Sequence, residues 1–193
     1  MYTISAPIET KIEIKKSIFI CNLMPVSNLD DVTSMLKQIR KHYYDATHNC
    51  YSYILGNKAD TYKYSDDGEP SQTAGIVIYN SLSKNSLTNV LCVVTRYFGG
   101  IKLGAGGLVR AYANSSSDAI SKASKSEIIE YELLSISFDY TYTTQVLKLL
   151  NSEEKVEQNY LENVQLIYRV PVSKISQYKE QLISLTNGSI KFD

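Results

Sequence analysis

The sequence has no tryptophan, only three cysteines and two histidines, and no surplus of either charge. The cysteines are far apart and form no C-x-x-C pair, which argues against a zinc ribbon or a disulfide framework and favours reduced thiols in a cytoplasmic protein. Equal numbers of basic and acidic residues, 20 of each, argue against a generally polycationic nucleic-acid binder. The first residues lack a continuous apolar stretch, and no run reaches the roughly 18 apolar residues of a membrane span, so neither a signal peptide nor a membrane partner is expected.

What is present is typical of a globular protein: 44% of the 193 residues are hydrophobic and 21% are charged. The charge is uneven, because residues 1–128 carry 14 basic and 11 acidic side chains, whereas residues 129–193 carry 6 and 9. This asymmetry supports at most a local basic patch on the first part. The composition also changes near residues 121–126, which are small and polar. We therefore predict two domains, 1–128 and 129–193.

The first domain alternates between strand and helix patterns. Asn28 is expected to cap a helix. The short apolar run 75–79 fits either a strand or the middle of a buried helix. The expected elements are a half-buried strand early in 8–20, a helix at 28–43, a strand at 50–56, a polar loop at 57–72, a buried strand at 89–95 and a helix at 108–124.

The second domain has a short and regular pattern. Its order β-α-β-β-α-β within about 60 residues is the ferredoxin-like split unit, a fold that serves many unrelated tasks. The expected elements are a strand at 133–142, a helix at 143–152, a hairpin of 155–160 and 164–171, a helix at 173–187 closed by Gly188, and a last strand with Ile190 and Phe192.

A glycine-rich turn is the strongest functional signal in the chain. Five of the nine glycines lie within nine residues, between a β-branched strand and a helix pattern: Gly99, Gly100, Gly104, Gly106 and Gly107. Three basic residues lie in or beside this turn: Arg96, Lys102 and Arg110. Free backbone N–H groups, a helix start and basic side chains together favour a bound anion. The alternative is that these glycines serve only tight turning and close packing. Neither G-x-x-x-x-G-K-[ST] nor G-x-G-x-x-G is matched, so a P-loop is disfavoured.

Two other segments carry unusual polar residues. His48 precedes a strand and could act as a proton carrier or an anion ligand, or simply make a local hydrogen bond. Asp66, Asp67 and Glu69 could hold Mg²⁺, form an acidic turn, or pair with Arg96 or Arg110 across a cleft. Ser71 or Thr73 could cap a second helix and strengthen an anion site that includes His48 and Thr73.

These three segments together resemble the YigZ/IMPACT family of small cytosolic proteins. The matching stretches are D-A-T-H-N-C-Y, S-D-D-G-E-P-S-x-T-A-G and V-T-R-Y-F-G-G-I-K-L-G-A-G-G-L-V-R-A-Y. The resemblance implies an α+β protein, with an N-terminal domain like ribosomal-protein and elongation-factor-G domains and a C-terminal ferredoxin-like βαββαβ domain. It also implies a role related to RNA, the ribosome and translation regulation. The regulatory partner of eukaryotic members is not carried over, because they bind it through a domain absent here.

Gln72 departs from the family pattern, which usually has Gly at this place. A side chain at this place either narrows the site or adds an amide hydrogen bond, and it argues against a requirement for a left-handed backbone at position 72.

Three functions stay open at this point. The first, which we favour, is a non-enzymatic protein that binds a phosphate-bearing ligand such as RNA, with Arg96 and Arg110 forking onto phosphate oxygens. The second is an enzyme for a phosphate-containing small molecule, with His48 as acid or base and Mg²⁺ held by the acidic residues. The third is a protein-partner module, in which these residues mainly hold the fold.

Overall fold

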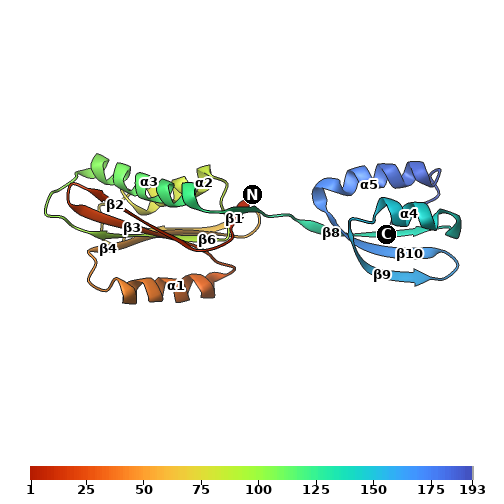
Figure 1. Ribbon diagram of the computed structural model, residues 1–193, viewed down its shortest axis with the longest axis horizontal. Helices are drawn as coiled ribbons and strands as arrows, with labels where there is room; N and C mark the ends of the chain where they lie inside the picture. Colours follow the sequence, from red (N-terminus) through yellow and green to blue (C-terminus); the bar gives the residue numbers. More distant parts are fainter. Residues whose placement is uncertain (193) are drawn as a thin grey trace. The chain divides into compact units, whose positions relative to one another are not determined.

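The computed structural model describes residues 1–192, and its contacts divide the chain into two compact units, Met1–Ile128 and Ile129–Asp193. Each unit has its own buried apolar cluster and is α+β in architecture, as the sequence predicts. Figure 1 shows the helices and strands of both units. Among the described residues no helix is long and apolar enough to cross a membrane.

The first unit is built on a five-stranded antiparallel sheet in the order β2-β3-β6-β4-β5. The central strand β6 has the sequence V-L-C-V-V-T-R-Y, and all but its last residue are buried. Apolar β-branched residues of this kind fit a strand that is covered on both faces. The strands are β2 (Ile8–Ile14), β3 (Ser17–Pro25), β4 (His48–Leu55), β5 (Thr61–Ser65) and β6 (Val90–Tyr97).

Helices cover both faces of this sheet. Figure 1 shows α2 (Gly75–Lys84) and α3 (Ala105–Lys122) on one face and α1 (Leu29–His42) on the other. The N-cap of α1 is the predicted one, because the Asn28 side chain accepts a hydrogen bond from the N–H of Asp31 at 2.9 Å. Residues 75–79 are helical rather than extended, which settles the ambiguity of the short apolar run.

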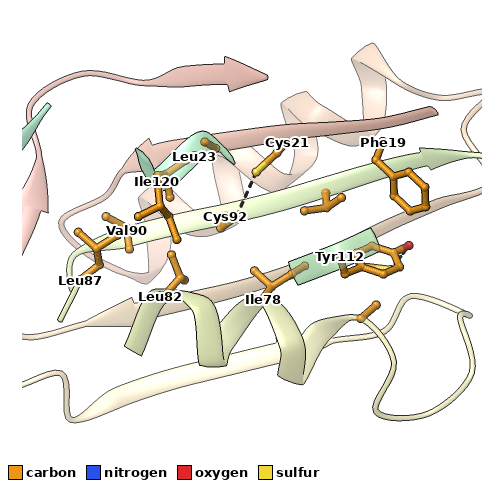
Figure 2. Packing of buried hydrophobic residues seen from close by; sticks show 14 of the residues in the cluster. Phe19, Cys21, Leu23, Ile78, Leu82, Leu87, Val90, Cys92, Tyr112 and Ile120 are labelled. Carbon is orange, nitrogen blue, oxygen red and sulfur yellow. Dashed lines mark hydrogen bonds between the residues drawn. The ribbon is translucent and has the colours of Figure 1, made fainter. Parts of the chain in front are cut away.

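The main core lies between the sheet and the helices α2 and α3 (Figure 2). Phe19 and Tyr112 meet edge to face with ring centroids 5.4 Å apart. The Sγ atoms of Cys21 and Cys92 lie 3.4 Å apart, and this contact together with burial raises the pKa of the Cys21 thiol well above its ordinary value. All three cysteines are free and buried, as expected for a protein with reduced thiols.

Three parts of the first unit differ from the prediction. The segment 8–20 forms two strands joined by a two-residue turn at Lys15 and Lys16. The expected loop 57–72 contains the edge strand β5, which sequence patterns miss because four of its five side chains are exposed. A third, two-stranded sheet pairs β1 (Tyr2–Ile4) with β7 (Lys125–Glu127).

The second unit has the predicted ferredoxin-like topology, with an antiparallel sheet in the order β11-β8-β10-β9. Buried residues of both helices, such as Val146 and Leu182, pack on the alternating inward residues of β8 and β10. The predicted strand 133–142 is too long, because the chain turns at Asp139 and forms a short 3-10 helix. The elements are β8 (Tyr131–Phe138), η1 (Tyr140–Tyr142), α4 (Thr143–Leu149), β9 (Glu154–Tyr160), β10 (Val164–Pro171), α5 (Val172–Leu185) and β11 (Lys191–Phe192).

Candidate functional site

A cavity of about 430 Å³ in the first unit brings the three unusual segments of the sequence together. His48 at the start of β4 lies directly opposite Arg96 near the end of β6. The acidic segment after β5 contributes Glu69, and the glycine-rich turn contributes the residues up to the first turn of α3. The cavity is lined by Thr47, His48, Glu69, Pro70, Arg96, Phe98, Lys102, Leu103, Gly104, Ala105 and Leu108.

Arg96 and Glu69 form a buried ion pair at the inner wall of this cavity. Arg96 Nη1 donates to Glu69 Oε1 at 2.7 Å, and the side chains are only 6% and 2% exposed. The hydroxyl of Tyr112 donates to the same oxygen at 2.8 Å. One of the sequence alternatives, an internal pair between the acidic segment and Arg96, is therefore confirmed. We expected the Arg96 guanidinium to be available for phosphate oxygens. In the structure it faces Glu69 and Ser17 instead.

The groups behind this pair stay protonated at neutral pH. Cys50 Sγ donates to the Tyr112 hydroxyl at 3.2 Å. Burial raises the pKa of the Cys50 thiol to about 12 and raises the pKa of Tyr112 even further. Cys50 is consequently a poor nucleophile, since the thiolate is the reactive form. The cluster of Cys50, Tyr112, Glu69 and Arg96 is an internal hydrogen-bond network, in which the buried Arg96 Nε has no hydrogen-bond partner among the described residues.

His48 is held in one orientation by the acidic segment. Its Nδ1 lies 2.9 Å from the carbonyl oxygen of Asp67. A carbonyl oxygen only accepts, so Nδ1 carries the hydrogen and Nε2 is the free ring nitrogen. Nε2 lies 3.9 Å from Glu69 Oε2. Gly68 permits this approach, because a Cβ there would lie 3.3 Å from His48 Nδ1 and the residue has φ of +89°.

The carboxylates of the acidic segment have separate partners. Asp66 Oδ1 accepts hydrogen bonds from the N–H groups of Ala74 and Gly75, and therefore occupies the N-terminus of α2. Asp67 Oδ2 accepts from the N–H of Asn49 at 2.7 Å, and its Oδ1 lies 3.2 Å from Arg40. Among the described residues no group of three His, Cys, Asp or Glu side chains could hold a metal ion. The magnesium site expected at Asp66, Asp67 and Glu69 is not supported by this finding and stays a prediction.

The start of α2 corrects two expectations from the sequence. Thr73 does not cap the helix, because its hydroxyl donates to the carbonyl of Pro70 at 2.6 Å and the residue is buried. Gln72 adopts φ of +63°, so the loop does have a left-handed backbone at this position. Its N–H donates to Asp66 Oδ2 at 2.9 Å, which explains why the chain turns here. The left-handed backbone that Gln72 argued against is therefore present.

The glycines of the turn have different tasks. A Cβ on Gly99 would lie 2.0 Å from the backbone of Lys16, so Gly99 is required by close packing. Gly100 and Gly104 have positive φ and therefore serve the turn itself. Gly104 is the N-cap of α3 and offers no side-chain cap. Gly106 and Gly107 form the first turn of α3.

The basic residues divide into two groups. Lys102 is exposed and lines the cavity, whereas Arg110 is exposed on α3 and is not among the lining residues. Two further lysines, Lys15 and Lys16, are exposed in the β2–β3 turn that packs against Gly99. Sequence reasoning missed these two, because the turn between the strands was not recognised. The available signal was the pair of lysines directly before S-I-F-I.

Comparison with known proteins gives matches over both units. Residues 15–120 match the model of the Impact N-terminal domain, and residues 136–189 match a domain of unknown function, DUF1949. The chain is 38% identical to the IMPACT family member YvyE of Bacillus subtilis, over 97% of this chain and 87% of that protein. It is 30% identical to the IMPACT family member YigZ of Escherichia coli, over 97% and 94%. A crystal structure of a hypothetical protein superposes with a TM-score of 0.66 at 28% identity, over 99% of this chain and 95% of the other.

Proposed function

This chain belongs to the IMPACT family, and from that membership and the geometry of the cavity we propose a non-enzymatic cytoplasmic protein that binds RNA. In this proposal the start of α3, beside Lys102, receives a phosphate group of the RNA backbone. The family resemblance supports a ribosome-related setting and a role in translation regulation.

The uncapped start of α3 is the observation that carries the proposal. The N-terminus of α1 is capped by Asn28, and that of α2 is filled by the Asp66 carboxylate. The N-terminus of α3 has no side-chain cap, and Gly104 and Ala105 line the cavity. Free N–H groups and the helix dipole favour a negative charge at this point. A phosphate in the cavity would therefore take the position that a carboxylate takes at α2.

The charges around the cavity favour the same ligand. Asp66, Asp67 and Glu69 are all engaged by internal donors, so their negative charge is compensated within the fold. The exposed cations Lys15, Lys16, Lys102 and Arg110 add positive charge around the turn. The buried Arg96–Glu69 pair then forms a rigid part of the cavity lining, and the flexible side chain of Lys102 supplies the cationic contact with the phosphate.

The test is the binding of single-stranded RNA measured over a series of salt concentrations. Lys102→Gln should weaken binding and reduce the slope of log affinity against log salt by about 0.7, the value for one lost phosphate contact on a single strand. Lys102→Gln with Arg110→Gln should reduce it further. Lys37→Gln, on the exposed side of α1 and on the other face of the sheet, is the matched control and should change neither quantity.

Two outcomes would contradict the proposal. One is a wild-type protein that binds neither RNA nor ribosomes. The other is a Lys102→Gln variant with unchanged affinity and unchanged salt slope. Variants of Lys102 and Arg110 that lower the melting temperature without affecting RNA binding would support the protein-partner alternative.

His48 favours a second candidate function, an enzyme for a phosphate-containing small molecule. Its Nε2 is free of the Asp67 contact and stands next to Glu69 in a cavity whose volume is within the usual range for small-molecule sites. An acid or base in this place could move a proton on a bound phosphate ester. This candidate predicts turnover that is lost in His48→Ala. Absence of turnover across nucleotides and phosphoesters, with and without Mg²⁺, would exclude it.

A further inference from the structure

Part of the cavity lining is apolar, which a phosphate group alone does not require. Pro70, Leu103, Leu108 and the ring of Phe98 line it together with the charged residues. Phe98 is 46% exposed, although a large aromatic side chain gains free energy by burial. A flat apolar ring beside an anion site is the arrangement that nucleotides use, since each has a phosphate and a base with a π-face.

Phe98 is held in place by its neighbours. Its backbone N–H donates to the Thr47 hydroxyl at 3.0 Å, which ties the turn to the start of β4. The Arg96 guanidinium carbon lies 5.5 Å from the ring centroid, and Arg96 is itself fixed by Glu69. The exposed ring is therefore presented by an ordered backbone and has a cation beside it.

Glu69 also offers an unused acceptor at the cavity wall. Its Oε1 receives the hydrogen bonds of Arg96 and Tyr112. Its Oε2 lies 3.9 Å from His48 Nε2, which is beyond hydrogen-bond distance. A carboxylate oxygen of this kind accepts a hydrogen bond from an amino group. Adenine, cytosine and guanine carry an exocyclic amino group, and uracil does not.

We propose that the cavity holds one whole nucleotide of single-stranded RNA, with its base stacked on Phe98 and its phosphate at Lys102 and the start of α3. The amino group of the base donates to Glu69 Oε2, so the site prefers adenine, cytosine or guanine over uracil. A cavity of about 430 Å³ is of the size that accepts a ligand of this class. This inference rests on the proposed function and adds the part of RNA that the site selects.

The sequence has no tryptophan, so the fluorescence of a tryptophan introduced at position 98 would report directly on stacking of a base at this position. Phe98→Trp introduces a single tryptophan at the cavity and keeps an aromatic surface. Oligo(A) or oligo(C) should bind this variant at least as tightly as wild type and should quench its fluorescence. Phe98→Leu keeps an apolar side chain but removes the π-face, and should bind about 5- to 150-fold more weakly, the range for the loss of one base–aromatic stack.

Tyr62→Trp is the matched control for the quenching. Tyr62 is 52% exposed on β5 and pairs with Ile54, at the other end of β4 from His48. A tryptophan at this position should not be quenched by the same oligonucleotides. An abasic oligonucleotide of equal length should bind weakly and leave the fluorescence of Phe98→Trp unchanged. Oligo(U) should bind more weakly than oligo(A) and oligo(C).

The failures of the two proposals are distinguishable. Suppose that wild-type protein binds RNA and that Lys102→Gln lowers the salt slope, while Phe98→Leu binds like wild type and Phe98→Trp is not quenched. The phosphate site would then stand, and the base site would be overturned. Quenching of Tyr62→Trp instead of Phe98→Trp, or equal binding of the abasic strand, would overturn it too. Equal affinity for oligo(U) would remove the role assigned to Glu69, and absence of all RNA binding would overturn both proposals.

Discussion

Arg96 Nη1 lies 2.7 Å from Glu69 Oε1, and both residues are almost wholly buried beneath the candidate site. Removing one partner of a buried ion pair leaves the other charge without compensation. We expect Arg96→Ala and Glu69→Ala each to lower the free energy of unfolding by about 3–5 kcal/mol, measured by urea denaturation. An alanine at position 96 is therefore a poor probe of ligand binding, because it changes the fold first.

A double variant separates the pair from its surroundings. Arg96→Met with Glu69→Leu should cost clearly less than the sum of the two alanine variants, because neither charge is left alone. Additive costs would show that the two side chains are stabilised by other contacts rather than by each other.

The Lys15–Lys16 turn predicts a conflict between stability and binding. Both lysines have positive φ, 47° and 66°, in a two-residue hairpin loop where Asn and Gly are favoured. Lys15→Asn with Lys16→Gly should raise the free energy of unfolding by about 1 kcal/mol, because it relieves left-handed strain. The same variant should weaken RNA binding and lower its salt slope. A variant that gains stability and keeps full RNA affinity would show that these lysines lie outside the interface.

Gln72 predicts a stabilising substitution in the loop before α2. Because its φ is +63°, Gln72→Gly should raise the free energy of unfolding by up to about 1 kcal/mol in urea denaturation. Gln38→Gly provides the matched control: Gln38 lies within helix α1, where glycine should lower stability by about 1 kcal/mol. The prediction fails if both substitutions destabilise the protein to the same degree.

Glu153 gives the second unit a dependence on acid pH. Burial raises the pKa of this carboxyl, but hydrogen bonds from Lys174, Tyr178 and Ser152 outweigh burial and hold the pKa below its ordinary value of 4.5. The stabilisation is therefore present above about pH 4.5 and is lost as the pH falls through the lowered pKa of the folded state.

Two variants test this dependence. Glu153→Gln should destabilise the second unit by about 1 kcal/mol at neutral pH and flatten its acid dependence, measured by hydrogen exchange of β10 amides. Glu180→Gln, which replaces an exposed glutamate of α5, is the control and should leave the profile as in wild type. An unchanged profile in Glu153→Gln would contradict the assignment.

Elements with strong periodicity could be predicted from the sequence. The helix capped by Asn28, the buried strand that contains Cys92 and the ferredoxin-like order of the second unit all have local patterns that determine them. Helix α3 begins at Ala105, one turn before the predicted Leu108, because Gly106 and Gly107 lower the helix propensity of a turn that packing nevertheless makes helical.

The rest depends on contacts between residues far apart in the sequence. Asp66 caps a helix that begins nine residues later, and the distance of 27 residues between Glu69 and Arg96 closes only when β4, β5 and β6 pair. The sequence indicated that the three polar segments belong together. It could not show that Arg96 is buried and paired with Glu69 while Lys102 is exposed, because that depends on how deeply each side chain lies in the fold.

The pairing of β1 with β7 joins the first residues of the first unit to its last ones, since Tyr2 lies opposite Glu127 and Ile4 opposite Lys125. A domain whose two ends lie side by side can be joined to other segments with little effect on its own fold. The pairing also implies that removal of residues 1–4 would leave β7 without its partner strand, and would loosen the last residues of the unit as well as the first.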